Sequence, residues 1–208
     1  MTQLGFFVDS SKCSGCKTCQ VACKDNKDLD LGLRFRRVYE YGGGNWVSDG
    51  GAWHQETFTY YLSIACNHCD DPVCVSGCPT GAMHKRPEDG LVVVNGDICV
   101  GCRYCEMRCS YGAPQFDPTA KIMRKCDGCL SRLERGLRPI CVDSCPQRAL
   151  DFGPIEELRA RYGVENEIAP LPSHDLTHPN LVVKPHPTAR PTGDHEGQVQ
   201  NWGEVRHA

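Results

Sequence analysis

The chain has 208 residues, a formal net charge of −3 and 16 cysteines, a far larger share of cysteine than ordinary domains carry. This length allows one or two domains, and the near-neutral charge gives no sign of a nucleic-acid-binding protein. The longest aliphatic run, LVVV at 91–94, is much shorter than the ~18 residues of a membrane-spanning helix.

Three chemistries use many cysteines: disulfides, zinc sites and iron–sulfur clusters. The first residues, MTQLGFFVDSSKC, argue against disulfides. They have neither the basic region nor the long apolar segment of a signal peptide, whereas disulfide scaffolds are typically short secreted chains. A disulfide framework is therefore disfavoured, and iron–sulfur and zinc chemistry remain.

The cysteines form four groups of four along the chain, with none left over. They are Cys13, Cys16, Cys19 and Cys23, then Cys66, Cys69, Cys74 and Cys78, then Cys99, Cys102, Cys105 and Cys109, and finally Cys126, Cys129, Cys141 and Cys145.

These groups are of two alternating types. Residues 8–23 align without a gap with residues 94–109, and both read C-x-G-C-x2-C-x3-C after a short apolar stretch. Residues 66–83 and 126–150 both begin with C-x2-C and end with x3-C-P-x2-A, although the second has a longer insert. The repeat indicates a duplicated unit that contains one group of each type.

The spacing C-x2-C-x2-C-x3-C-P is typical of ferredoxins with two iron–sulfur clusters, in which the fourth cysteine binds the neighbouring cluster. Gly15 and Gly101 allow a tight backbone turn between the first two cysteines. A zinc ribbon needs only two C-x2-C pairs, so a zinc-stabilised scaffold is the weaker alternative. His68 lies inside CNHC, but sixteen cysteines already fill four sites, so we interpret it as a surface or hydrogen-bonding residue.

Residues 24–65 separate the first two groups and contain alternating, aromatic-rich stretches broken by glycines at 42–44 and 50–51. This pattern predicts a β-rich insertion of strands and turns. Two interpretations of its aromatic residues remain: they anchor a partner, or they cover clusters and pack a small sheet. The residues are Trp46, Trp53, Tyr60 and Tyr61.

Residues 66–109 hold the second and third groups, joined by a predicted hairpin with turn signals at Asp89-Gly90 and Asn95-Gly96. We expect one compact ferredoxin-like unit here. The first and fourth groups, in residues 1–23 and 110–153, must then pair across it. The predicted fold is α+β, with two ferredoxin-like two-cluster units, one nested inside the other.

The C-terminal region, residues 154–208, is predicted to comprise a short helix and an extended tail. A helix is expected at 154–163, between a proline and a glycine. Beyond it, residues 165–208 are rich in proline and histidine and have no apolar periodicity. We expect this tail to lack a core and to be disordered or to order along a partner. Its histidines, His174, His178, His186 and His195, lack metal-site spacing.

Several stretches resemble the four-cluster electron-transfer subunits of molybdopterin oxidoreductase complexes, above all the iron–sulfur B subunits of the anaerobic dimethyl sulfoxide reductase family. The likeness extends over nearly the whole chain. The matching stretches are GFFVDSSKCSGCKTCQVACKD, FRRVYEY, CNHCDDPVCVSGCPTGAMHKR, CVGCRYC, YGAPQFD, KCDGC, RPICVDSCPQRALDFG and RPTGD.

The resemblance implies four 4Fe-4S clusters with ligands shared between groups. Related nitrate reductase subunits carry tryptophan and a 3Fe-4S cluster at the position of Cys102. Ser110 departs from the family, which usually has proline there. The implied ligand sets are Cys13, Cys16, Cys19 and Cys145; Cys23, Cys126, Cys129 and Cys141; Cys66, Cys69, Cys74 and Cys109; and Cys78, Cys99, Cys102 and Cys105.

The resemblance also implies a heterotrimer. Its other members are a catalytic subunit with molybdenum-bis(pterin guanine dinucleotide) and a membrane anchor that oxidises menaquinol. Electrons would pass through this chain to reduce dimethyl sulfoxide and related S- and N-oxides in anaerobic respiration. Selenate, tetrathionate, polysulfide or formate chemistry in the partner is the alternative.

The chain has no nucleotide fingerprint, pterin-sized domain or nucleophile constellation, so we expect no catalysis by this subunit alone. The resemblance implies a peripheral position on the bacterial inner membrane, held through the partners. Without a signal of its own, the chain would reach the periplasm only with a signal-bearing catalytic subunit, and the resemblance favours that side.

Overall fold

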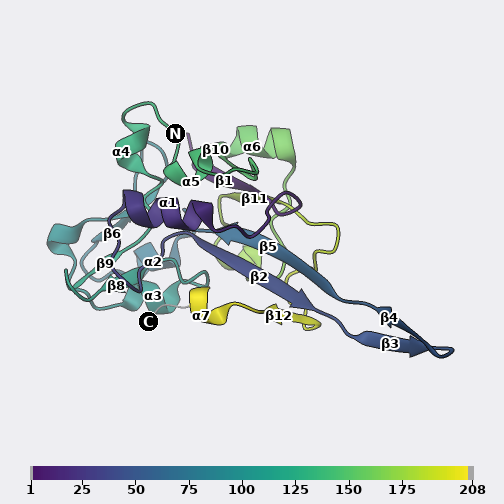
Figure 1. Ribbon diagram of the computed structural model, residues 1–208. Coiled ribbons are helices and arrows are strands. Elements are labelled where there is room, and N and C mark those ends of the chain that lie inside the picture. The colour runs from purple at the N-terminus through teal and green to yellow at the C-terminus, as the bar shows by residue number, and fades with distance from the viewer. Residues whose placement is uncertain (1, 206–208) are drawn as a thin grey trace.

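The computed structural model describes residues 2–205 and shows a mixed α+β fold built from short elements (Figure 1). The helices are α1 (Thr18–Asn26), α2 (Val73–Ser76), α3 (Tyr104–Arg108), α4 (Leu130–Leu133), α5 (Ile140–Asp143), α6 (Ile155–Tyr162), α7 (Trp202–Val205) and the 3-10 helices η1 (Gly96–Ile98) and η2 (His174–Leu176). The strands are β1 (Leu4–Asp9), β2 (Arg37–Gly43), β3 (Trp46–Asp49), β4 (Ala52–Gln55), β5 (Phe58–Ile64), β6 (Met83–Lys85), β7 (Val92–Val94), β8 (Gln115–Asp117), β9 (Ile122–Arg124), β10 (Leu150–Pro154), β11 (Leu181–Lys184) and β12 (Gly197–Val199).

The first sheet has the order β10-β1-β11, in which β1 is antiparallel to β10 and parallel to β11. Successive side chains of a strand point to opposite faces. Phe6 and Val8 therefore belong to the main core, whereas Phe7 packs under α6 with Ile155 and Leu158. Because both faces of β1 are covered, its sequence is almost continuously apolar.

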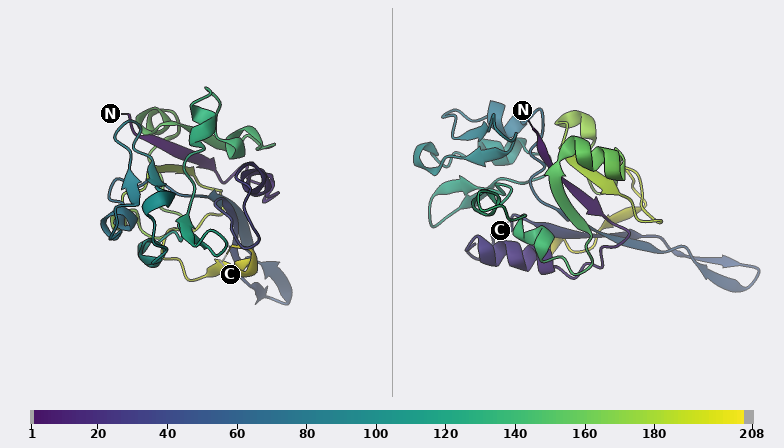
Figure 2. Two further views of the ribbon diagram at one scale, coloured as in Figure 1. Left: turned by 90° about the vertical axis from the view of Figure 1, so that its left-hand side faces the viewer. Right: turned by 90° about the horizontal axis from the view of Figure 1, so that it is seen from above.

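The second sheet has the order β12-β2-β5, and the chain runs from β2 through the β3–β4 ribbon back to β5. Within residues 24–65, for which strands and turns are predicted, the structure has four strands, all between residues 37 and 64. In β5 the residues Phe58, Tyr60, Leu62 and Ile64 are buried and face the core at every second position. The β3–β4 ribbon projects beyond the rest of the molecule (Figures 1 and 2).

The four aromatic residues of this insertion divide between the two interpretations. Tyr60 is buried, and its hydroxyl donates to the carbonyl oxygen of Ala169 at 2.7 Å. Tyr61 lies so close to Gly15 that a Cβ there would overlap the tyrosine ring. Tyr60 and Tyr61 therefore pack the sheet and cover a cysteine loop, whereas Trp46 and Trp53 stay exposed.

Two further predicted elements are confirmed. The hairpin between the second and third cysteine groups is the β6–β7 pair, in which Met83 lies opposite Val94. The helix predicted at 154–163 is α6, which ends at Gly163 with a φ of 96°. No helix among residues 2–205 combines the length and the apolar character needed to cross a bilayer.

The expectation that the tail cannot contribute to a core is wrong. β11 pairs with β1, β12 pairs with β2, and Ile168, Ala169 and Leu171 are buried in the main core. Each apolar segment of the tail is too short to show a periodicity by itself. Each one adds to a sheet whose other strands come from distant parts of the chain, so the tail orders along its own chain.

We expect Leu181→Ala to lower the stability of the fold by about 2–5 kcal/mol, because it leaves a cavity between β11 and the main core. Leu181 is 2% exposed and lies opposite Phe6 of β1. The measurement is the urea midpoint, followed by circular dichroism without oxygen. Leu176→Ala is the control, since Leu176 is 56% exposed on the same tail. Equal midpoints for both variants would show that the tail does not support the core.

Candidate iron–sulfur centres

The sixteen cysteines are all free thiols, and the structure brings them together in four sets of four. Each set joins three cysteines of one group with the last cysteine of another group. The sets are the same as those that the resemblance implies. The first site is Cys13, Cys16, Cys19 and Cys145; the second site is Cys23, Cys126, Cys129 and Cys141; the third site is Cys66, Cys69, Cys74 and Cys109; the fourth site is Cys78, Cys99, Cys102 and Cys105.

The first and fourth sites each line a small cavity. All four cysteines of the first site surround one cavity, together with Val38 of β2 and Ser63 of β5. The four cysteines of the fourth site surround another, together with Met83, Val94 and Met123. Each cavity thus presents four sulfur donors within an otherwise largely apolar wall, which is the donor set of a 4Fe-4S cluster.

The second and third sites are recognised by the mutual repulsion of their thiolates. Burial first, and then the charges of Cys141 and Cys129, raise the pKa of Cys23 to about 12. In the third site, burial and the charges of Cys66, Cys109 and Cys69 raise the pKa of Cys74 to about 12. The raised pKa values show how close together and how buried these sulfurs are, and four such sulfurs form the donor set of an iron–sulfur cluster.

The loops of the two C-x-G-C groups have the same backbone conformation, as expected from their gap-free alignment. Gly15 and Gly101 have φ values of 70° and 65°. Lys17 and Arg103 also have left-handed φ values, 61° and 64°, although they are not glycines. Each of the two cationic residues immediately precedes a helix, α1 or α3. The repeated left-handed turns wrap each loop around its site.

Backbone amides point at several cysteine sulfurs. Such N–H donors stabilise cluster sulfur and tune its reduction potential. Ser110 is exposed, and the turn that follows it still directs an amide to Cys109. The pairs are Ala149 N to Cys145 Sγ at 3.3 Å, Met83 N to Cys78 Sγ at 3.4 Å, Met123 N to Cys99 Sγ at 3.4 Å and Ala113 N to Cys109 Sγ at 3.5 Å.

Arg36 lies between the first and second sites and is 1% exposed. Its Nη1 donates to Ser63, and its guanidinium carbon lies 4.6 Å from the ring centroid of Phe6. Burial by itself lowers the pKa of Arg36, but the charges of Cys141 and Cys19 raise it above the usual value. Among residues 2–205 its Nε and Nη2 find no hydrogen-bond partner. Two buried N–H groups without partners fit an adjacent negatively charged cluster.

Lys125 occupies the corresponding place between the second and third sites and is 5% exposed. Its Nζ donates to the carbonyl oxygens of Val92 and Cys126. Burial lowers the pKa of Lys125, but the nearby charges of Cys66, Cys126 and Cys74 raise it overall. A buried cation therefore lies at each of these two junctions.

The third and fourth sites are joined by α2 and α3. Cys74 of α2 and Cys105 of α3 belong to one small buried cluster, against which Cys78 and Cys99 pack. The four sites therefore follow one another in the order first, second, third, fourth. Every cysteine of the second site is buried, whereas Cys16 of the first and Cys102 of the fourth are exposed.

Two of these residues were not recognised correctly from the sequence. Arg36 is part of FRRVYEY, far in sequence from any cysteine group, and nothing local distinguishes it from the next arginine. His68 is fully buried, so the alternative of a surface residue is wrong and the hydrogen-bonding one holds. Its Nδ1 accepts the backbone N–H of Val92 at 2.9 Å.

Most basic residues beside the motifs are paired with carboxylates and do not face sulfur. Lys85 contacts Asp70, and Arg103 contacts Glu106. Of the cations adjacent to cysteines in sequence, Lys125 is the one that is buried among the sites.

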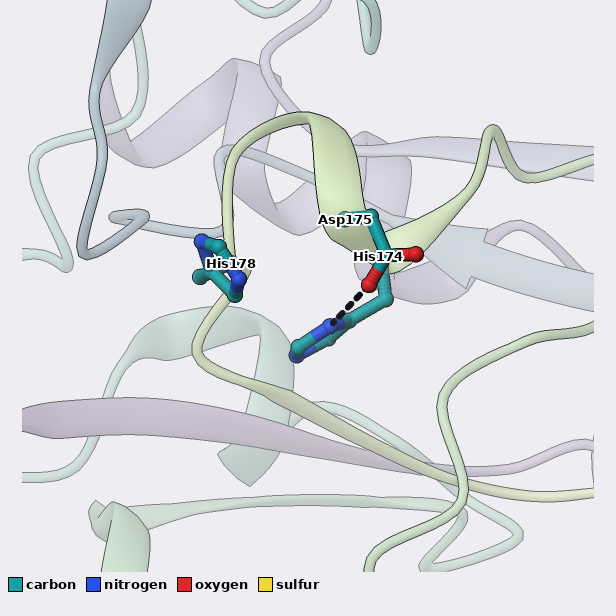
Figure 3. A group of neighbouring side chains, drawn as sticks. All are labelled: His174, Asp175 and His178. Carbon is teal, nitrogen blue, oxygen red and sulfur yellow. Dashed lines mark ion pairs between the residues drawn. The ribbon is translucent and has the colours of Figure 1, made fainter.

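Two of the tail histidines lie close together with an aspartate. Potential ligand atoms of His174, Asp175 and His178 lie within 4.8 Å of one another (Figure 3). His178 Nδ1 is 2.7 Å from a carboxylate oxygen of Asp71, and the amide of Asp71 donates to the carbonyl oxygen of Thr177. Because Asp71 follows Cys69 closely, this group fastens the tail to the loop of the third site.

Comparison with known proteins agrees with this geometry. A family model described as a 4Fe-4S dicluster domain matches residues 57–155. The chain is 60% identical to the B subunit of anaerobic dimethyl sulfoxide reductase from Escherichia coli K12, over 98% of this chain and 99% of that protein. The chain belongs to the family of anaerobic dimethyl sulfoxide reductase B subunits.

Two further members show the same full-length match. The probable anaerobic dimethyl sulfoxide reductase subunit YnfG of E. coli K12 is 61% identical, over 98% of this chain and 99% of its own length. The B subunit of the Haemophilus influenzae reductase is 59% identical, over 99% of this chain and 100% of its own length. The family resemblance and the iron–sulfur character predicted from the sequence are therefore confirmed.

We expect Arg36→Met to lower the reduction potential at the first or second site, because a buried positive charge favours the more negative, reduced state. At an effective dielectric constant of about 20 and a separation of roughly 8 Å, the lost interaction is about 2 kcal/mol, or roughly 90 mV. The measurement is a redox titration followed by electron paramagnetic resonance.

Two control variants separate charge from packing. Arg36→Lys keeps the charge and should restore part of the potential, whereas Arg161→Met removes an exposed charge on α6 and should change nothing. Potentials that are the same in Arg36→Met and the unaltered protein would show that Arg36 has only a packing role.

Proposed function

We propose that this chain is the electron-transfer subunit that relays electrons from a menaquinol-oxidising membrane anchor to a molybdopterin catalytic subunit. The catalytic subunit, which holds the molybdenum-bis(pterin guanine dinucleotide), would reduce dimethyl sulfoxide and related S- and N-oxides. The observation that carries the proposal is the row of four cysteine sites, with an exposed sulfur at each end. When bound, 4Fe-4S clusters supply reversible one-electron transfer. The full-length relatives favour sulfoxide over selenate, tetrathionate, polysulfide or formate chemistry.

Each of the four sites would hold one 4Fe-4S cluster through its own four cysteines. All cysteines of the third and fourth sites lie within residues 66–109, which supports an inner ferredoxin-like unit there. Those of the first and second sites come from residues 1–23 and 110–153, which supports an outer unit around it. Residues 24–65 would be the β-rich insertion. Residues 154–208 would be the helix and the tail, which bind along both the inner and the outer unit.

The surroundings of the fourth site support its contact with the membrane anchor. Beside Cys102 the apolar side chains of Ile98, Val100, Tyr104 and Met107 are between 47% and 70% exposed. Exposed apolar groups that gather in one place mark a surface for a partner. The opposite end of the row, at Cys16, would then face the catalytic subunit.

The chain itself would not turn over substrate, because all sixteen cysteines belong to the four sites and none remains as a nucleophile. It would be held on the bacterial inner membrane through its partners. We favour the periplasmic side, reached together with a signal-bearing catalytic subunit.

Metal analysis of the complex, purified without oxygen through this chain, tests the proposal directly. We expect about 16 iron atoms from this chain, at four per cluster, and near one molybdenum per complex. Iron without molybdenum would show that the partner is not the proposed molybdopterin subunit. Zinc instead of iron would contradict the relay function.

Cys102→Ser and Cys16→Ser form a matched pair, since both remove an exposed sulfur at corresponding positions of the repeat. We expect Cys102→Ser to convert or destabilise the fourth cluster and to slow quinol-linked reduction of all remaining clusters by about tenfold or more. In Cys16→Ser, quinol should still reduce the remaining clusters, whereas sulfoxide reduction should fall. Rapid-freeze electron paramagnetic resonance after quinol addition distinguishes the two. The reverse pattern would invert the proposed direction of the row.

A further inference from the structure

The β3–β4 ribbon is the part of the β-rich insertion that does not contribute to the core. All residues of Trp46–Asp49 and Ala52–Gln55 are exposed. Trp46 is 62% exposed and Trp53 is 67% exposed, although tryptophan is among the side chains most buried on average. Figure 1 and the right-hand view of Figure 2 show the ribbon extending away from the body.

The register of the ribbon places both indoles on one face. Trp46 lies opposite Gln55, and Ser48 lies opposite Trp53. Residues directly opposite each other in an antiparallel pair share a face, and so do residues two apart on one strand. Trp46 and Trp53 are therefore diagonal neighbours on one face, whereas Val47 and His54 form the other face.

A two-stranded hairpin without further support is only marginally stable in water. Here the ribbon continues the β2–β5 pair, and its base is closed by a hydrogen bond from the amide of Glu56 to the carbonyl oxygen of Asn45 at 2.9 Å. Gly44, with a φ of 92°, separates the ribbon from β2, and a Cβ there would overlap the carbonyl oxygen of Glu56. The chain therefore builds an arm with an aromatic face that its own described residues leave uncovered.

The arm continues a sheet that also lines the first site. Val38 of β2 and Ser63 of β5 form part of the wall of the first-site cavity, and they pair near the ends of these strands that are remote from the arm. The elements of the fourth site, with α3 and β6, lie at the opposite end of the molecule (Figure 1). A protein that approaches exposed Cys16 therefore meets the sheet from which the arm extends.

The charge of the arm argues for a protein surface and against a lipid surface. Residues 44–57 contain Asp49 and Glu56 and no lysine or arginine. Anionic lipid headgroups attract basic segments and would repel this one. The ribbon is acidic, although Asp49 lies with Val47 on the face opposite the indoles. A protein groove that receives the indoles on an apolar floor and carries basic groups at its edge matches this arm.

We propose that the β3–β4 ribbon docks its Trp46–Trp53 face into such a groove on the catalytic subunit and holds that subunit against the first site. This inference rests on the proposed function, since the occupant is the partner that takes electrons at Cys16. The two tryptophans are the energetic centre of the contact, because large aromatic side chains dominate protein interfaces.

The test uses the intact complex and the double variant Trp46→Ala/Trp53→Ala. We expect the catalytic subunit to leave the diluted complex at least about tenfold faster, as measured by native mass spectrometry, since two central aromatic contacts are lost. The membrane anchor should be retained. The matched control is Val47→Ala/His54→Ala on the opposite face of the same ribbon, which should dissociate at the rate of the unaltered complex.

Hydrogen exchange provides a measurement that requires no variant. The amides of residues 46–55 should exchange more slowly in the complex than in the free chain. The docking inference is overturned if they exchange equally, if the double variant behaves as its control, or if the double variant releases the anchor instead. It is also overturned if the slower amide exchange arises from self-association of the chain or from binding to anionic vesicles.

Metal content separates this inference from the proposed function. If the unaltered complex contains iron and molybdenum but the tryptophans have no effect, only the docking inference fails. If the chain carries iron without a molybdenum subunit, the proposed function fails and the docking partner fails with it.

Discussion

Sulfur in the interior is the constraint on which the rest of the structure depends. As ligands of bound clusters, four sets of cysteines would bring negative charge into a small core, and a buried charge must be paired or neutralised. The fold answers with cations that are themselves buried, Arg36 between the first and second sites and Lys125 between the second and third. The nearby cysteine sulfurs raise the pKa of both cations despite their burial. Each cation is therefore placed where it would offset the negative charge of bound clusters.

The sharing of cysteines between groups also determines how the helices pack. Cys19 and Cys23 lie on α1, one in the first site and the other in the second. Cys141 of α5 belongs to the second site, and Cys145 follows α5 and belongs to the first. α1 and α5, with the cysteine that follows α5, therefore contribute to the same two sites, and α2 and α3, with the cysteines that follow them, do so for the third and fourth sites. These helices are too short to be stable alone, so we infer that cluster binding and folding are coupled.

The two ends of the row differ in their surroundings, and this difference gives the molecule a direction. Near the fourth site the surface carries a group of exposed apolar side chains on short loops and on α3. Near the first site lie the sheet that continues into the projecting ribbon and the helix α7, and Lys17 pairs there with Glu204 of α7. A chain with two different ends can contact two different partners without exchanging them.

The sequence by itself determined the features that depend on short spacing. The position of three cysteines in each site, the repeat, the hairpin at β6–β7 and the helix α6 all follow from residues close together in the chain. Only the tertiary structure decided that Arg36 and His68 are buried beside the sites, that the tail completes both sheets, and that Tyr60 faces inward while Trp46 faces outward. The physical reason is that local spacing restricts local backbone geometry. Burial and charge pairing, in contrast, depend on contacts between residues far apart in the chain, such as Tyr60 with Ala169.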